Sequence, residues 1–591
     1  MIVGMKKIFV VVQEKDILPA LENLRQLGLL HIEHVDEPVD TSVHELEDKL
    51  ELIGRVIDVL GQEKHMPPQI KAKDPEQVAI GVNDLTGMRA RLEDEFNKRQ
   101  GEINAWEPWG DFKPEDILRL RERGIFIELA EIPKKELKSI SADVTVQIID
   151  SKKDPVRCVL VSRREKQEYP FSVLPMPAAG LKDLMNQQEE TRREIHQCTE
   201  KIKASAQYVD SLRQAREELI REINFRSVYA GRGRAQHFAF LKGYCPEDRI
   251  ERLSGAARKE SWGILIEDPA EDDPVPTLLR SPQWVEIVQP LFSWLNIVPG
   301  YREMDISIIF LFFFSLFFGI LIGDAGYGLV FLGVTAAVHL KLKKKNADLR
   351  AIFLMYVLSF CTIAWGALSG TFFGQAWLSG MEPWPVQAWL RDNRNFQWLC
   401  FLIGSVQLSI AHIWRGIRRM PSISVISEIG WLLVLWGMFF VANLLILGKD
   451  FPEAAKGLFI IGPMLVVFFA HPSSNIFKTL GLGVGELLNN IVNTFTDIVS
   501  YIRLFAVGLA TIAVADAFNE AAVGIGFSNV LTGLITALIL VVGHVFNMAL
   551  GAMSILVHGL RLNVLEFSSH LNLEWKGFPY NPFRKTKESE V

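Results

Sequence analysis

The fold of this chain is decided in the stretch 491–515, which reads IVNTFTDIVSYIRLFAVGLATIAVA. This run is longer than the roughly 20 mostly apolar residues that a helix needs to cross a bilayer. It nevertheless contains the permanently charged Arg503. A guanidinium at bilayer depth costs roughly 2.5 to 3.5 kcal/mol on insertion scales, and it cannot lose its proton to escape that cost. The stretch therefore predicts a membrane helix in which Arg503 has a function.

The chain divides by composition into a polar half and an apolar half. Of its 591 residues, 49% are hydrophobic and 22% are charged, with charge concentrated before about residue 299 and apolar runs dominating from about residue 305. We expect a soluble domain at 1–300, an all-α membrane domain at 301–570 and a polar tail at 571–591. The first residues have neither a long apolar core nor a cleavage site, so we expect the soluble half to stay in the cytosol.

The soluble half has the pattern of an α+β dumbbell, in which two small α/β lobes are joined by antiparallel coiled-coil helices. Strand-like runs occur at 8–12, 29–35, 125–132, 144–149, 156–161, 237–243 and 262–266, with short helices at 17–27 and 249–258. Coiled-coil spacing is followed by Leu46, Leu50, Ile53, Ile57 and Leu60, by Leu85, Met88, Leu92 and Phe96, and within 195–223. We expect a proximal lobe at 1–38 with 229–270, arms at about 40–107 and 180–228, and a distal lobe at about 110–178. A plain helical spacer explains the periodicity equally well.

Several classes of function have no support in the sequence. The net charge is −6, without long blocks of like charge, which argues against nucleic-acid binding. The five cysteines are scattered without metal-ligand spacing, so we expect neither a metal site nor disulfides. The glycine-rich run 481–485 lacks the Lys-Ser/Thr of a phosphate-binding loop. We therefore expect no direct ATP binding, no cofactor and no catalytic group in this chain.

The apolar half has the pattern of eight membrane helices. The candidate spans are roughly 305–322, 326–340, 351–370, 397–413, 425–447, 457–470, 485–519 and 529–565. Basic residues gather at 341–350, at 415–419, at Lys478 and after residue 576, which are all on one side in this topology. The positive-inside rule then places both termini in the cytosol. The last two spans far exceed 20 residues, so we expect them to tilt or to project from the bilayer.

Each of these two long spans carries a polar stripe. At 100° per residue, an arc of about 120° on the seventh span holds Asn489, Asn493, Thr496, Asp497, Ser500 and Arg503. A similar arc of about 100° on the eighth holds His544, Asn547, Ser554, His558 and Arg561. Facing polar stripes on long apolar helices predict the walls of water-filled passages.

Each polar residue also has a structural interpretation that the sequence leaves open. Arg561 lies close to Glu566 near the predicted cytosolic end, so an ion-paired or snorkelling anchor is a balanced alternative. Asn489 and Asn493 are also typical of interhelical hydrogen bonds. Asp497 could pair with Arg503 or line a passage. His544 and His558 could relay protons or pack with ordinary hydrogen bonds.

Two motifs resemble a known family. The segments 500–506 (SYIRLFA) and 558–567 (HGLRLNVLEF) are similar to the paired arginine motifs of the stator a subunit, also called subunit I, of V-type and A-type rotary ATPases. The segments 301–305 (YREMD), 318–328 (FGILIGDAGYG) and 24–32 (LRQLGLLHI) are also similar to that family. The resemblance covers essentially the whole chain in order.

The resemblance implies a function in ion translocation. In this family the stator presents arginines to a rotating ring of small subunits, each with a membrane-embedded carboxylate that binds a proton or sodium ion. Two offset aqueous half-channels connect that carboxylate to opposite sides of the membrane. By this resemblance Arg503 and Arg561 act in translocation. The candidate half-channel residues are Asn489, Asn493, Asp497, Ser500, His544, Asn547, Ser554, His558 and Glu566. The implied partners are the ring, peripheral-stalk subunits, the central-stalk adaptor that joins the ring, and membrane lipid.

Two other classes of protein remain as alternatives. An ion-coupled secondary transporter could bury an arginine, but it should show inverted repeats or broken helices and needs no cytosolic dumbbell. A membrane-anchored scaffold or sensor explains the dumbbell, but not two polar stripes that each end in an arginine. The predicted topology favours a multi-pass protein of a prokaryotic plasma membrane.

Overall fold

The computed structural model describes residues 1–585 except 36–40, 63–66, 138–139, 141–142, 151–153, 165–168, 170, 172, 344–347, 375–384 and 473–474. Part of the predicted distal lobe and the end of the predicted tail thus lie outside the described residues. The chain forms two compact units, one of residues 1–33 with 236–591 and the other of residues 34–235. The first unit joins the predicted proximal lobe to the apolar half of the chain.

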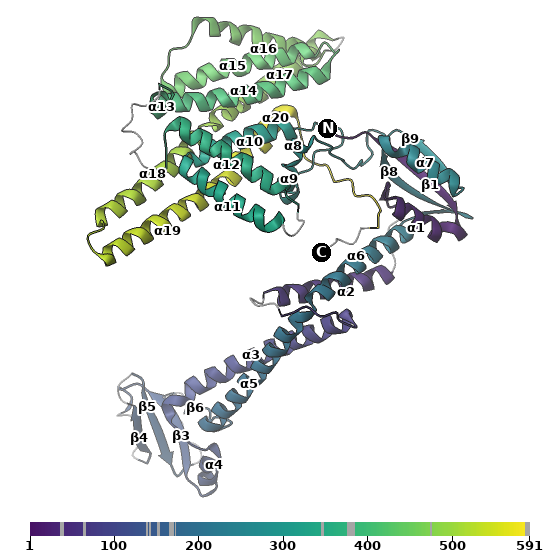
Figure 1. Cartoon of the computed structure of the whole chain (residues 1–591). Coiled ribbons are helices and arrows are strands. Elements are labelled where there is room, and N and C mark those ends of the chain that lie inside the picture. Colours follow the sequence, from purple (N-terminus) through teal and green to yellow (C-terminus); the bar gives the residue numbers. More distant parts are fainter. Residues whose placement is uncertain are drawn as a thin grey trace. The chain divides into compact units, whose positions relative to one another are not determined.

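The unit of residues 34–235 consists of long helices and one antiparallel sheet (Figure 1). Its helices are α2 (Thr41–Gly61), α3 (Pro75–Trp106), α4 (Pro114–Glu122), α5 (Leu181–Ser205) and α6 (Val209–Ala230). Its sheet has the order β4-β5-β3-β6, formed by β3 (Phe126–Ile132), β4 (Thr145–Asp150), β5 (Val156–Ser162) and β6 (Val173–Leu174). A further short strand, β7, spans Gly233–Ala235. Strands therefore occupy the three runs predicted between the helical arms.

The helices of this unit share one apolar junction. Its buried members are Ile53, Val56 and Leu60 of α2, Ala79 and Val82 of α3, Ile202 at the end of α5, Ala206, and Val209 and Leu212 of α6. The predicted seams were only partly correct. Met88 of α3 is 51% exposed, and Val56 rather than Ile57 is fully buried in α2. Four helices meet at this junction, so the buried face departs from the position that a two-helix seam requires.

The proximal lobe is an antiparallel sheet with the order β2-β8-β1-β9. Its elements are β1 (Met5–Gln13), α1 (Ile17–Leu27), β2 (His31–Glu33), β8 (Phe238–Pro246), α7 (Ile250–Lys259) and β9 (Gly263–Glu267). Alternate residues of β1 are buried, as expected of a strand with one face on a core. Helix α1 ends at Gly28, which adopts the left-handed conformation that glycine tolerates best.

The apolar half consists of helices of very different length. In chain order they are α8 (Gln283–Glu286), α9 (Gln289–Trp294), α10 (Ser307–Ile322), α11 (Ala325–Lys343), α12 (Arg350–Ser369), α13 (Pro385–Arg391), α14 (Asn393–Arg419), α15 (Val425–Leu447), α16 (Leu458–Phe469), α17 (Ile476–Ser500), α18 (Ile502–Ile525), α19 (Val530–Ser554) and α20 (Phe567–Leu571). Within the described part of the chain, six helical stretches are long and apolar enough to cross a membrane. The two other predicted spans are α10, of 16 residues, and α16, of 12 residues.

The last two of these stretches are the longest. One runs from Ile476 to Ile525 through α17 and α18, and the other from Val530 to Leu571 through α19 and α20. Figure 1 shows α18 and α19 side by side, extending away from the other apolar helices. Only 17% of the apolar window of the final stretch is buried within the chain. Most of α19 therefore faces lipid or a partner.

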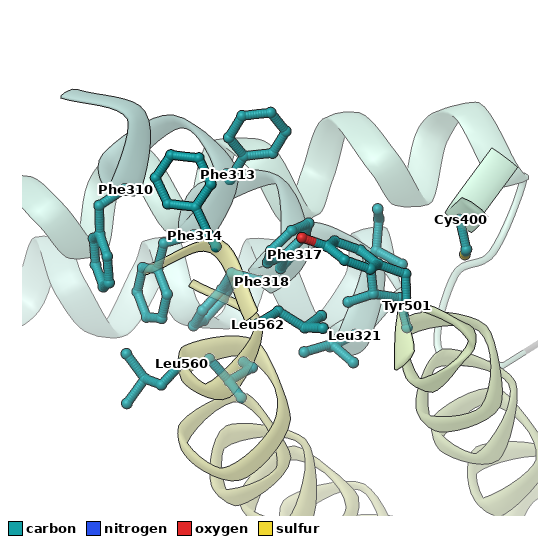
Figure 2. Close-up of a cluster of buried hydrophobic side chains, with 14 of the residues drawn as sticks. Phe310, Phe313, Phe314, Phe317, Phe318, Leu321, Cys400, Tyr501, Leu560 and Leu562 are labelled. Carbon is teal, nitrogen blue, oxygen red and sulfur yellow. The ribbon is translucent and has the colours of Figure 1, made fainter. Parts of the chain in front are cut away.

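Helix α10 forms the centre of this half. It is apolar on every side, which is typical of a helix enclosed by other helices. Figure 2 shows its residues Phe310, Phe313, Phe314, Phe317 and Phe318 gathered with Tyr501, Leu560 and Leu562. Helix α10 thereby packs against both segments that carry the arginine motifs.

The polar tail connects the last helix to the proximal lobe. The Phe583 amide donates to the Leu30 carbonyl at 2.8 Å, and the Lys585 amide donates to the Arg25 carbonyl at 3.0 Å. The Tyr580 hydroxyl donates to the Leu29 carbonyl at 2.5 Å. The tail thereby bonds to the last turn of α1 at Arg25 and to the two residues that follow its C-cap Gly28.

Candidate functional site: an arginine pair and two cavities

Arg503 and Arg561 bind the same carboxylate. One Oε1 atom of Glu566 accepts from the Arg503 guanidinium and lies 3.3 Å from Arg561 Nε. The Glu566 side chain is only 5% exposed, whereas those of Arg503 and Arg561 are 20% and 55% exposed. The interpretation of Arg561 as an ion-paired residue thus agrees with the structure. Asp497 does not pair with Arg503, because Glu566 holds that position.

A break in the helix positions Arg503. Helix α17 ends at Ser500 and α18 begins at Ile502, with Tyr501 in a turn between them. The break leaves the Ser500 carbonyl able to accept from Arg503 Nε at 3.0 Å. Ser500 therefore contributes its backbone rather than the side chain that the sequence pattern indicated. The seventh polar stripe is not one straight face.

The turn at Tyr501 is fixed by buried hydrogen bonds that reach the other arginine segment. The Tyr501 hydroxyl donates to Gln407 Oε1 at 2.9 Å, and Gln407 Nε2 donates to Asn563 Oδ1 at 2.9 Å. All three side chains are fully buried. Since an unpaired buried amide is costly, this chain of bonds holds α14, the α17–α18 turn and the Arg561 segment in register. The sequence interpretation missed Gln407, a lone polar residue in an ordinary helix, and gave no role to Asn563 within the second arginine motif.

Two π-helical turns flank Arg561, at Ile555–Gly559 and Leu562–Glu566. Such turns insert extra residues into a helix and are frequent at functional sites. They bring Arg561 and Glu566 together although the two residues are five positions apart. His558, in the first turn, is within electrostatic reach of both arginines.

A buried chain of titratable groups lies beside this cluster. Asp497 Oδ2 is 3.0 Å from His570 Nε2, and His570 Nδ1 is 3.0 Å from His412 Nε2. His412 Nδ1 is in turn 3.0 Å from Glu428 Oε2. The other oxygen of Glu428 accepts from Arg415 Nε at 2.6 Å and lies 2.7 Å from Arg419 Nη1. The sequence interpretation found Asp497 but missed His412, Glu428 and His570, which stand on three different helices without a local pattern.

All of these groups except Glu428 line the first of two cavities. The first cavity has a volume of about 320 Å³ and is lined by His412, Arg415, Arg419, Trp431, Ala470, His471, Glu486, Asn490, Asn493, Thr494, Asp497, Ser569, His570 and Asn572. Asn493 and Asp497 therefore border a cavity. Asn489 points elsewhere and is exposed, whereas its neighbour Asn490 is part of the lining.

The second cavity lies further along α18. It has a volume of about 280 Å³ and is lined by Ile320, Gly323, Trp365, Ser369, Gly370, Thr371, Gly374, Leu390, Arg391, Asn393, Phe396, Gly508, Leu509, Ile512 and Asp516. Neither lining, as described, includes Ser500, Ser554, His558 or Glu566. The sequence interpretation had not selected Arg391 or Asp516 for this site.

His544 and Asn547 take part in a hydrogen-bond network away from both cavities. The Tyr327 hydroxyl lies 2.8 Å from His544 Nδ1 and accepts from Asn547 Nδ2 at 3.0 Å. Asn547 Nδ2 also donates to the Thr511 carbonyl at 2.8 Å. The structure thus places these two residues in helix packing between α11, α18 and α19. In the described part of the chain, no group of three or more His, Cys, Asp or Glu residues is placed to hold a metal ion.

Comparisons with known proteins identify relatives along the whole chain, although no protein-family model matches it. V-type ATP synthase subunit I of Borreliella burgdorferi is 32% identical over 617 residues, covering 100% of both chains. V-type ATP synthase subunit I 1 of Treponema pallidum is 32% identical over 630 residues, covering 99% of this chain and 100% of the relative. A-type ATP synthase subunit I of Pyrococcus horikoshii is 26% identical over 441 residues, covering 72% and 64%.

The family resemblance inferred from the two arginine motifs is thereby confirmed. Together with the six apolar helices, it makes the chain an integral membrane protein that works with other subunits of a larger complex. The chain belongs to the subunit I family of V-type and A-type ATP synthases and is a membrane subunit of a rotary ATPase.

Proposed function

We propose that this chain is the stator that presents Arg503 and Arg561 to a ring of small membrane subunits, each carrying an intramembrane carboxylate. The observation that supports this most is the sharing of one buried carboxylate by two arginines. Two guanidinium charges and one carboxylate charge leave a net charge of +1. Because a guanidinium stays protonated in proteins, the cluster remains positive and attracts an ionised carboxylate from a partner.

The surface around Arg561 is suited to such a partner. Helix α19 exposes a series of large apolar side chains, including Leu538, Val541, Val545, Phe546 and Met553, and the π-helical turn that follows it exposes Val557. An apolar face of this extent is covered either by lipid or by another membrane protein. Arg561, at 55% exposure, lies at the end of that face. A ring subunit that packs on α19 therefore brings its carboxylate near the arginine cluster.

The two cavities support the half-channels of the proposal. Asp497 lines the first cavity and Gly508 lines the second, with Arg503 between them along the same helical stretch. At 1.5 Å per residue, Gly508 lies about 7.5 Å after Arg503 along α18, whereas Asp497 lies in α17, before the break at Tyr501. An ion thus reaches the ring from one cavity and leaves through the other. Arg503 holds the ring carboxylate ionised between the two and prevents a direct leak.

The remaining details of the proposal follow the predicted topology. Eight spans place both termini in the cytosol of a prokaryotic cell. The first cavity then opens to the cytosol, because Arg415 and Arg419 at its edge belong to the basic end of α14. The 1–300 domain, with its lobes and arms, connects the motor to peripheral stalks and to the central-stalk adaptor of the ring. The chain binds no ATP and moves protons or sodium ions.

The test is replacement of Arg503 in the assembled complex reconstituted into liposomes. Arg503→Ala abolishes ATP-coupled ion pumping, while the ring still co-purifies with the chain. Arg503→Gln gives the same result with less loss of volume. Arg350→Gln is the matched control, because Arg350 is also an apolar-half arginine held by a carboxylate, Asp348, but lies at an exposed helix start.

The outcomes separate the proposal from its alternatives. Sustained coupled pumping in Arg503→Ala refutes the assigned role of this arginine. Ion transport by the purified chain alone, without a ring, supports a secondary transporter instead. Pumping lost equally in the Arg350→Gln control shows a general defect and removes the support for Arg503.

A further inference from the structure

A large apolar groove runs along α10 and α12. It has a volume of about 1230 Å³ and is lined mainly by apolar and aromatic side chains of α8, α10 and α12. Its lining combines the buried residues Leu311 and Phe313 with Phe312 and Phe360, which are 63% and 59% exposed. The described part of the chain therefore leaves this hollow open, and an apolar surface of this kind in a membrane protein is covered by lipid or by a partner.

The width of the groove favours a thin and flexible occupant. Helices α10 and α12 lie side by side (Figure 1). An ideal Cβ on Gly319 of α10 lies 2.8 Å from the carbonyl oxygen of Cys361, which is a lining residue on α12. Because a helix with its side chains is roughly 10 to 12 Å wide, a partner helix cannot enter between two backbones that are this close. The acyl chain of a lipid is narrow enough to follow such a groove.

The length of the groove also suits an acyl chain. Along α12 the lining runs from Phe353 to Leu368. At 1.5 Å per residue this is about 22 Å, out of a hydrocarbon thickness of roughly 30 Å. An extended chain that enters from one side of the membrane therefore stays in contact with the groove over most of its length.

Charge lies at one end of the groove only. The sequence 341–350 has five basic residues and one acidic residue, whereas 351–381 has no Asp, Glu, Lys or Arg. Helix α8 belongs to the basic end, because Arg350 at the start of α12 donates to Gln289 Oε1, just after α8, at 2.9 Å. Trp284 of α8 lines the groove and is 59% exposed, as is typical of a tryptophan at a bilayer interface. The groove thus has the polarity of a molecule with one charged head and an apolar tail.

A contact between α11 and α12 brings Lys343 to the basic end of the groove. His339 Nδ1 of α11 lies 3.2 Å from the hydroxyl of Tyr356, which is a lining residue. Lys343 follows His339 by four residues, so it stands on the same face of α11, one turn closer to the end of the helix. By the positive-inside rule this end faces the cytosol.

We propose that the groove binds an anionic membrane lipid, with one acyl chain along α10 and α12 and its headgroup phosphate at Lys341 and Lys343. Both lysines are exposed, whereas the acids at this end, Asp348 and Glu286, are within electrostatic reach of Arg350. Basic residues between membrane helices on the cytosolic side recur as sites for lipid phosphates. The proposal does not depend on the role assigned to the arginine pair.

The experiment uses the assembled complex in phosphatidylcholine nanodiscs that also contain phosphatidylglycerol with a photoactivatable diazirine in one acyl chain. Peptide mass spectrometry then locates the label, which we expect on 307–322 and 351–369. A lysine beside an anionic lipid surface strengthens binding by a factor of roughly five, so Lys341→Gln combined with Lys343→Gln should lower this labelling roughly tenfold or more. Lys478→Gln is the matched control, because Lys478 is an exposed lysine near the start of another apolar helix, α17, and should leave the labelling unchanged.

A second pair of variants tests the groove itself. Ala364 is an exposed residue of α12 that lines the groove, so Ala364→Phe fills the groove without displacing buried side chains. We expect this variant to lose most of the label. Added phosphatidylglycerol should also raise the melting temperature of the detergent-solubilised parent complex more than that of Ala364→Phe. Ala337→Phe is the matched control, because Ala337 is an exposed alanine of α11 outside the lining.

Three results would overturn the proposal. Labelling that stays at the parent level in the double lysine variant shows that these lysines do not hold the headgroup. Equal displacement of the probe by phosphatidylcholine and by phosphatidylglycerol shows that the groove accepts any lipid. A parent complex without label on 307–322 and 351–369, with or without a cross-link to another subunit, shows that no lipid occupies the groove. Pumping by the Arg503 variants is measured separately, so none of these results decides the proposed function.

Discussion

The interaction free energy between Arg503 and Glu566 can be measured with a double-mutant cycle. The cycle consists of Arg503→Gln, Glu566→Gln and the variant that carries both replacements. Removal of one partner of a buried ion pair costs roughly 3 to 5 kcal/mol, because the other charge stays buried. In Arg503→Gln, Glu566 keeps Arg561 at 3.3 Å, but that arginine is 55% exposed and its charge is screened by solvent. We therefore expect a loss of about 3 kcal/mol for Arg503→Gln.

The reverse replacement should cost less. In Glu566→Gln, Arg503 keeps the Ser500 carbonyl at 3.0 Å, and Arg561 can turn toward water. We expect a loss of about 2 kcal/mol for Glu566→Gln and a similar loss for the double variant, so the interaction energy is about 3 kcal/mol. In a unit of this size, 1 kcal/mol lowers the melting temperature by about 2 °C or less. Arg503→Gln should thus melt at most about 6 °C below the parent.

The assay is thermal unfolding of the purified chain in detergent, followed by tryptophan fluorescence. The exposed pair Arg350–Asp348, with side chains 46% and 51% exposed, serves as the matched control in the same cycle. Its interaction energy should be below about 1 kcal/mol. If the Arg503 and Glu566 effects add within about 0.5 kcal/mol, Glu566 is not the counter-ion of Arg503 and the reasoning fails.

Two further predictions concern packing. An ideal Cβ on Gly404 lies 2.5 Å from the ring of Tyr501, so Gly404→Ala should cost roughly 1 to 3 kcal/mol by displacing that ring. Gly333 has open space around it, so the control Gly333→Ala should leave the melting temperature unchanged. Equal melting temperatures of the two variants would contradict this prediction. Burial raises the pKa of Cys245 to about 12, so its thiol should resist maleimide at neutral pH in the folded chain. Tyr580→Ala, which loosens the tail beside Cys245, should speed this labelling as measured by peptide mass spectrometry. Rapid labelling of the parent would show that the thiol is not enclosed.

The sequence made the elements predictable because their signals are local. Apolar runs of membrane length and alternating strands depend on neighbouring residues alone, so the helices around α10 and all strands of both sheets except the short β6 and β7 lie where the patterns indicated. Arg503 was identifiable for the same reason, since one charge in an apolar run needs no knowledge of the fold. Coiled-coil seams were less predictable, because helices from distant segments pack at one junction and this packing determines which residues are buried.

The site was less predictable because its contacts join distant segments. His412, Glu428 and His570 each look like an isolated polar residue, and only the packing of α14, α15 and α20 brings them together. The polar stripes were derived for straight helices at 100° per residue. The turn at Tyr501 and the π-helical turns around Arg561 change that angle, so the residues of one stripe face different surroundings.

Glu566 also affects how tightly the proposed stator would bind a carboxylate of the ring. If Arg503 had no partner in its own chain, a passing ring carboxylate would form a tight ion pair with it, and leaving that pair would oppose rotation. Here the ring carboxylate meets a cluster that already holds one carboxylate and retains a net charge of +1. The attraction keeps the incoming carboxylate ionised, while Glu566 is ready to replace it as it departs. Passage through such a site needs binding that is favourable on arrival and weak enough for release, and a shared resident carboxylate provides both.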